Sequence, residues 1–359
     1  MATKSMLLVG TRKGAFILES DAARKSWTVS EPLCEGWPIH DISVDQRTGA
    51  LLAGGGSPWY GPAVWRSEDL GKTWTHSSEG LTYGDDGPKI PTIWNVTAAN
   101  GSIYAGVEPA GLFRSEDDGK TWSHVGALRD HPSRPEWQPG AGGLILHTIS
   151  PHATDKNRMW VGISAVGVFE TRDGGATWTT RNKGVRADFN PENIYPEFGQ
   201  CVHKMYAAAG EPETLYQQNH CGVYRSDNGG ESWNEITPGL PSQFGFPAVG
   251  HPRDADTMWI IPMNGDDRGR FMPDAAAAVW RTNDRGASWT RLAKGLPQQD
   301  AYITVLREAM AVDRHDNVGV YFGTEGGEVW ASPDGGESWQ EIAAHLPAVW
   351  SVEAHVVDA

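Results

Sequence analysis

One eight-residue pattern recurs along the chain and ends each time in tryptophan. It has Ser or Thr first, Asp or Asn third, Gly fifth and Trp eighth, and complete copies end at Trp74, Trp122, Trp178, Trp233, Trp289 and Trp339. A degenerate copy, residues 20–27, keeps only the first and last positions. Successive tryptophans from Trp27 onward are separated by 47, 48, 56, 55, 56 and 50 residues. This period is typical of a four-stranded propeller blade, so seven copies predict seven blades.

Between the repeats, short apolar runs alternate with turn residues. Residues 93–97, 102–107 and 111–115 are rich in β-branched and aromatic residues and are bounded by Gly, Asn or Asp. Such runs predict strands, and no long stretch has the periodicity of an amphipathic helix. The expected fold class is therefore all-β, a seven-bladed β-propeller.

The two ends of the chain predict how the ring closes. Residues 1–31 supply only three strands of the first blade, whereas residues 348–359 contain a spare strand after the last repeat. That strand should become the innermost strand of the first blade and so remove the exposed sheet edges. We therefore expect residues 1–359 to form a single propeller.

The repeated box suits a tight hairpin. Its hydroxyl and carboxylate can accept hydrogen bonds from turn N–H groups, and its glycine adopts backbone angles that other residues resist. The tryptophan can then bury a large apolar face between neighbouring sheets. Carboxylates spread around the rim of a ring would not converge on one ligand, so we interpret the box as structural.

Composition narrows the partners. The chain has 30 Lys and Arg against 45 Asp and Glu, a formal charge of −15, and it has no basic cluster that would neutralise phosphates. Nucleic acid and membrane are therefore not expected as partners. The partner that we expect is a small-molecule substrate. No apolar segment is long enough to span a bilayer, which favours a cytoplasmic location. Cys34, Cys201 and Cys221 are interpreted as reduced thiols. Cys201 and Cys221 could form a redox pair or bind a soft metal beside His203 and His220, but buried inert thiols are commoner, and neither is selected as a ligand.

The pattern Ser/Thr-x-Asp-x-Gly-x-x-Trp resembles the Asp-box, or BNR, repeat of sialidases, sortilin-type receptors and a plant photosystem II assembly factor family. The resemblance covers the whole chain and implies a propeller fold, while these relatives differ in function. Residues 194–203 and 215–222 are similar to bacterial seven-bladed proteins often labelled exo-alpha-sialidase. Sialidases have six blades and an Arg-Ile-Pro motif that this sequence lacks, so sialidase activity is not expected.

Ring symmetry can bring distant residues together at the axis. Three blades share a spacing of 13 residues between a candidate axial residue and an aromatic residue of the second strand: His147 and Trp160, His203 and Tyr216, and Glu308 and Tyr321. Similar matching in the other blades completes one predicted layer at the mouth of the propeller: Trp350, His40, Trp94, His147, His203, Phe246 and Glu308.

Three histidines and one carboxylate of this layer form a ligand set that divalent transition metals prefer. The predicted metal ligands are His40, His147, His203 and Glu308, and the candidate ions are Zn²⁺, Mn²⁺ and Fe²⁺. The aromatic members, Trp94, Trp350 and Phe246, are predicted to bind substrate. Histidines that line a channel can instead satisfy backbone carbonyls or hold ordered water, and this alternative stays open.

Loops at the same mouth supply candidate catalytic groups. Arg12 could clamp a substrate carboxylate, and Glu108 or His220 could act as a general acid or base. Two insertions, residues 127–143 and 183–200, enter first strands on this side, and their aromatic residues are typical of a pocket wall or lid.

The first functional hypothesis is a metal-dependent hydrolase or lyase acting on a small polar or carbohydrate-like molecule at the central mouth. One alternative is a non-catalytic binding or assembly propeller. Another is a metal-free glycoside hydrolase, with Glu108 and Glu325 as its two carboxylates.

Overall fold

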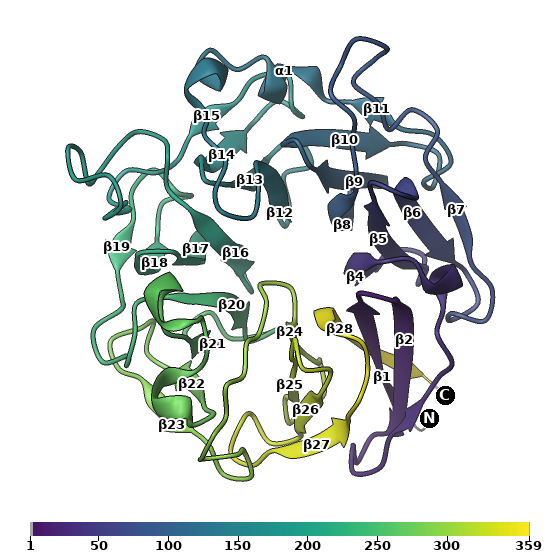
Figure 1. Cartoon of the computed structure of the whole chain (residues 1–359), viewed down its shortest axis with the longest axis vertical. Coiled ribbons are helices and arrows are strands. Elements are labelled where there is room, and N and C mark those ends of the chain that lie inside the picture. Colours follow the sequence, from purple (N-terminus) through teal and green to yellow (C-terminus); the bar gives the residue numbers. More distant parts are fainter. Residues whose placement is uncertain (1–2, 359) are drawn as a thin grey trace.

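Seven four-stranded antiparallel sheets surround a central axis in the computed structural model, which describes residues 3–358 (Figure 1). Each sheet is a blade, and the strands of one blade follow one another from the axis to the rim. The prediction of an all-β, seven-bladed propeller is therefore confirmed.

The strands of each blade are given from the innermost outward. Blade 1 contains β28 (Val349–Asp358), β1 (Thr3–Thr11), β2 (Gly14–Asp21) and β3 (Thr28–Val29). Blade 2 contains β4 (Ile39–Val44), β5 (Leu51–Ser57), β6 (Gly61–Ser67) and β7 (Thr75–Ser77). Blade 3 contains β8 (Ile93–Ala99), β9 (Ser102–Val107), β10 (Gly111–Ser115) and β11 (Ser123–His124). Blade 4 contains β12 (Ile145–Pro151), β13 (Met159–Ser164), β14 (Gly167–Thr171) and β15 (Thr179–Thr180).

The remaining blades follow the same order. Blade 5 contains β16 (Val202–Ala208), β17 (Glu211–Asn219), β18 (Gly222–Ser226) and β19 (Asn234–Glu235). Blade 6 contains β20 (Gly245–Gly250), β21 (Met258–Pro262), β22 (Val279–Thr282) and β23 (Thr290–Leu292). Blade 7 contains β24 (Met310–Val312), β25 (Val320–Gly323), β26 (Val329–Ser332) and β27 (Gln340–Ala343).

Helical structure is confined to short turns. These are η1 (Cys34–Gly36), α1 (Gly126–Arg129), η2 (Arg134–Glu136), η3 (Asp266–Arg268) and η4 (Pro273–Ala275). Within the described residues, none of these helices has the length and apolar character that crossing a membrane requires.

The ring closes as the sequence predicts. The C-terminal strand β28 pairs antiparallel with β1, so that Leu8 faces Glu353, and it forms the innermost strand of blade 1. The two ends of the chain accordingly lie side by side (Figure 1). Residues 1, 2 and 359, which the predicted blade 1 includes, lie outside the described part.

The Asp-box forms the turn between the third and fourth strands of a blade. In blade 3, Ser115 Oγ accepts a hydrogen bond from the amide of Gly119 at 2.8 Å. The Asp117 carboxylate accepts bonds from the amide and hydroxyl of Thr121 at 2.9 and 2.7 Å. Gly119 has φ +85°, a left-handed conformation that favours glycine, and Trp122 is buried. Because groups of the same turn satisfy the hydrogen-bonding capacity of the Asp117 carboxylate, the box has a structural role in this blade.

The core lies between neighbouring blades. Leu112 of β10, Val161 of β13 and Phe169 of β14 belong to one buried cluster that joins blades 3 and 4. Each such side chain contributes about 1.5–3 kcal/mol on full burial, so packing between the sheets fixes the ring and the positions of its innermost strands.

Candidate functional site

The innermost strands of blades 1 to 6 share an irregularity close to the residue at which each strand begins. Pairing with the second strand skips a residue there, which forms a β-bulge. The residues at these bulges are Trp350, His40, Trp94, His147, His203 and, in a wider bulge with Pro247, Phe246. A bulge redirects a side chain relative to the regular strand. These six residues matched from the sequence therefore occupy equivalent positions in their blades, whereas the seventh, Glu308, precedes β24, whose pairing with β25 has no such skip.

Part of this layer lines an axial cavity. The His40 ring lies between the indoles of Trp94 and Trp350, with centroids 4.4 Å from each. A cavity of about 230 Å³ is bounded by His40, Trp94, Leu306, Arg307, Glu308, Glu325 and Trp350. Burial, with a smaller effect of the Arg307 charge, lowers the pKa of His40 to about 3, so this ring is neutral at physiological pH.

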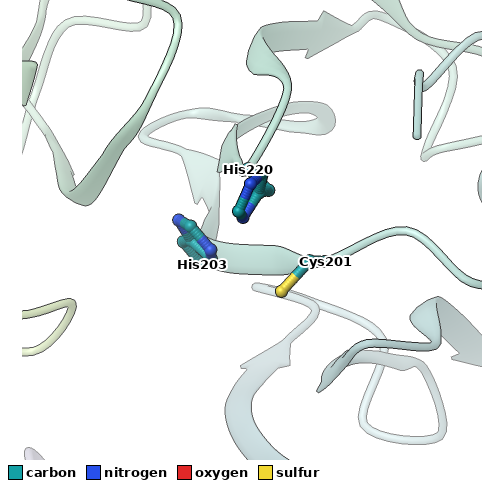
Figure 2. A group of neighbouring side chains, drawn as sticks. All are labelled: Cys201, His203 and His220. Carbon is teal, nitrogen blue, oxygen red and sulfur yellow. The ribbon is translucent and has the colours of Figure 1, made fainter. Parts of the chain in front are cut away.

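Another member of the layer, His203, belongs to a group of potential metal ligands. Cys201, His203 and His220 each offer one ligand atom, and these atoms lie within 4.8 Å of one another. Figure 2 shows the three side chains: Cys201 directly precedes β16, His203 lies near its start, and His220 lies in the β17–β18 turn. A tetrahedral zinc site places such atoms roughly 3.5 Å apart, so small side-chain movements would complete it.

Backbone and ring contacts position this group. The amide of His220 donates to the carbonyl of Cys201 at 2.9 Å, which holds the turn against the start of β16. His203 Nδ1 donates to the carbonyl of Gly245 at 2.6 Å, so Nε2 is the nitrogen that could bind a metal. Aromatic rings surround both imidazoles: Phe246 lies 4.7 Å from His203, and Phe189 lies 5.5 Å from His220.

His147 takes no part in this group. Its Nε2 donates to the carbonyl of Val202 at 2.9 Å, and its Nδ1 lies 3.0 Å from Thr148 Oγ1. Both ring nitrogens therefore have partners in the wall between blades 4 and 5. Burial lowers the pKa of His147, which is consistent with a neutral ring.

Glu308 lies just before β24, where its carbonyl accepts a hydrogen bond from the amide of Val352 at 2.8 Å. Its carboxylate forms an ion pair with Lys204 of β16. Glu308 also borders a second cavity of about 590 Å³, which Lys204, Asp41 and Glu353 line as well. Across residues 3–358, the four predicted ligands His40, His147, His203 and Glu308 do not form a compact group of metal ligands.

The predicted catalytic residues lie in different places. His220 belongs to the cysteine and histidine group. Arg12 is exposed in the β1–β2 turn, and its amide donates to the carbonyl of Ala348. Glu108 accepts a hydrogen bond from Trp94 Nε1 at 3.2 Å, outside the set of residues that line the axial cavity.

The insertions combine buried and exposed aromatic residues. Trp137 is buried, and its ring packs against Phe169 at 5.2 Å. Phe189 and Tyr195 of the second insertion are 52% and 54% exposed. The first insertion therefore covers blade 4, whereas the second presents apolar surface to solvent at the mouth.

Sequence reasoning did not select Cys201 and Arg307. The Cys-Val-His spacing at residues 201–203 was a usable signal, because residues two apart on a strand share a face. Arg307 carried no motif, and only the folded segment before β24 places it in the cavity.

Comparisons with known proteins place the chain among propellers. A family model described as the BNR-Asp box repeat matches residues 64–77. An ancestral GH74 enzyme superposes with a TM-score of 0.58 at 16% identity, covering 88% of this chain and 38% of that enzyme. YCF48 bound to a D1 peptide superposes with a TM-score of 0.54 at 15% identity, covering 85% of this chain and 82% of YCF48. AztD from Citrobacter koseri superposes with a TM-score of 0.55 at 11% identity, covering 100% of this chain and 99% of AztD.

These likenesses concern the fold alone, because the identities are low. The chain spans only 38% of the length of the GH74 enzyme. No curated protein matches it by sequence. The chain is a seven-bladed β-propeller that carries the BNR-Asp box repeat.

Proposed function

We propose that the protein is a metal-dependent hydrolase or lyase that acts on a small polar or carbohydrate-like molecule at the axial mouth. The observation that carries this proposal is the convergence of Cys201, His203 and His220, of which His203 belongs to the same layer of innermost-strand residues as His40, Trp94 and Trp350 of the axial cavity. Catalytic zinc sites use three protein ligands and leave a fourth position for water or substrate. A thiolate among the ligands favours Zn²⁺ over Mn²⁺, which prefers oxygen.

The axial cavity suits a small substrate. Its volume of about 230 Å³ is below the range of about 300–1,000 Å³ found for drug-sized ligands. Trp94 and Trp350 give it flat apolar surface, and Glu325 and Glu308 give it carboxylates. Arg307 lines the cavity and also interacts electrostatically with Cys201, so its charge acts on both parts of the mouth.

The residues of the cavity can assist hydrolysis. A metal in the group would polarise the substrate or activate a water molecule. In the hydrolysis, the water oxygen would bond to the reacting carbon, the bond from that carbon to the leaving oxygen would break, and the proton that the water loses would balance the proton that the leaving oxygen gains. Burial raises the pKa of Glu325, so this carboxyl group can hold a proton for that step.

Metal content tests the proposal. Protein purified without chelator should contain about one equivalent of zinc by mass spectrometry, and a Cys201→Ser, His220→Ala double variant should contain almost none. Cys221→Ser is the matched control, because Cys221 is a buried thiol of the same blade outside the group. The control should retain the metal. A wild-type protein without transition metal after zinc supplementation, or a double variant with full occupancy, would refute the metal centre.

The second candidate function, a binding or assembly propeller, is favoured by exposed aromatic side chains on loops of the mouth face. Trp59 is 89% exposed in the β5–β6 turn, and Tyr302 is 66% exposed before β24. A peptide is bound by the similar propeller YCF48. This function predicts that a Trp59→Ala, Tyr302→Ala variant loses a protein partner in a pull-down while its zinc content is unchanged.

A further inference from the structure

Arg307 lies in the axial cavity without a carboxylate partner. Its side chain is largely buried, and its Nε is a buried donor with no hydrogen-bond acceptor. Among the side chains that the structure describes, no ion pair involves this guanidinium. Its guanidinium carbon lies over the Phe246 ring, 5.5 Å from the centroid, in a cation–π contact. A buried cation of this kind is costly unless an anion compensates it.

Neither carboxylate of the cavity forms an ion pair with Arg307 among the described side chains. Glu308 is already paired with Lys204. Glu325 borders the same cavity, but burial raises its pKa and so favours its neutral form. The cavity therefore contains a guanidinium that has no ion-pair partner among the described side chains.

Arg307 lies near the central axis of the propeller. The cavity that Arg307 lines is also bounded by His40, Trp94 and Trp350, which belong to the innermost strands of blades 2, 3 and 1. The innermost strands of three blades meet only near the axis, so Arg307 lies close to it. A ligand that enters the mouth along the axis would therefore meet Arg307.

We infer that the axial cavity selects a small organic anion and that Arg307 binds its carboxylate or phosphate group. This inference rests on the proposed function in using the same cavity, but it needs no metal, because the binding group belongs to the chain. Arginine matches both oxyanions with paired N–H donors. The apolar indoles of Trp94 and Trp350 would contact the uncharged part of the ligand.

Calorimetric titration with three probes of similar size tests the inference: D-glucuronate, D-glucose 6-phosphate and uncharged D-glucose. At least one anion should bind about 10- to 100-fold more tightly than glucose, the range expected from one charge-assisted hydrogen-bond pair. The two anions distinguish a carboxylate from a phosphate preference. Arg307→Met should abolish the preference, and Arg307→Lys should retain only part of it. Failure of both anions to bind at millimolar concentration, or equal binding of glucose, would overturn the inference.

Arg314→Met is the matched control. Arg314 is exposed and borders the second cavity, so this variant removes the same charge from another part of the channel and should leave the preference intact. The titration is repeated on the Cys201→Ser, His220→Ala variant. Anion binding should persist there even if the protein proves to contain no metal. Loss of binding in that variant alone would mean that the anion binds a metal rather than Arg307, and would overturn the inference.

Discussion

The amide of His220 donates a hydrogen bond to the carbonyl of Cys201, with nitrogen and oxygen 2.9 Å apart. This bond ties the β17–β18 turn to the segment that enters β16, so the backbone holds all three potential ligands near one another before any metal binds. Such an arrangement reduces the ordering that metal binding requires.

His147 and His203 occupy equivalent bulges but should respond differently to substitution. His147→Ala removes the donor to the Val202 carbonyl and should cost about 1–3 kcal/mol of unfolding free energy without loss of metal. His203→Ala should lose the metal. Urea denaturation and metal analysis of both variants check this, and metal loss in His147→Ala would favour the ligand set predicted from the sequence.

The Asp-boxes should make stability depend on pH. Hydrogen bonds from the side chain and then the amide of Thr177 lower the pKa of Asp173 from 3.8 to about 2. Because the folded pKa is the lower one, this contribution is complete above about pH 4 and disappears as the pH falls to about 2. Asp173→Asn should therefore show a smaller decrease in urea midpoint between about pH 7 and pH 3 than the wild type.

Blade 5 supplies the reciprocal variant for this prediction. Asn228 already occupies the acidic position there, and its Oδ1 accepts a hydrogen bond from the amide of Ser232 at 3.0 Å. Asn228→Asp should increase the loss of stability on acidification. Identical pH profiles for Asp173→Asn, Asn228→Asp and the wild type would refute the role of the box in acid sensitivity.

The junction between blades 1 and 7 should depend on a buried ion pair. Arg24 Nη1 lies 2.7 Å from Asp313 Oδ2, with side chains only 7% and 2% exposed. Arg24→Met leaves the carboxylate without its cation and should cost about 3–5 kcal/mol in denaturation experiments. Lys4→Met, which breaks the exposed pair with Glu19, should change stability by about 1 kcal/mol or less. Equal effects of the two variants would contradict this account of the junction.

His40 should remain neutral through the physiological range. Burial and, to a smaller extent, the charge of Arg307 lower its pKa to about 3. Two-dimensional NMR of the imidazole should therefore show no titration between about pH 5 and pH 8. In Arg307→Met the pKa should rise but stay below 6.5, because burial persists. Titration of His40 near 6.5 in the wild type would contradict its burial between the two indoles.

The repeat made the fold predictable. Each box fixes one turn, and the tryptophan of each box packs at one interface between blades. The register of the innermost strands also followed from it, because the bulge recurs at the same position, as at His40 and His203. The site was harder to predict. Whether His203 or His147 has a nitrogen available depends on which carbonyl of the next blade each ring meets. No local pattern reveals that relation, nor the ion pair of Lys204 with Glu308 across the axis.

A crystal soaked in a zinc salt, with anomalous diffraction measured at the zinc absorption edge, tests the central claim most directly. The account predicts one strong anomalous peak at the mouth, bonded to Cys201 Sγ, His203 Nε2 and a ring nitrogen of His220, at about 2.3 Å from sulfur and 2.0–2.1 Å from nitrogen. A peak bonded to His40, His147 and Glu308, or no peak at the mouth, would contradict it.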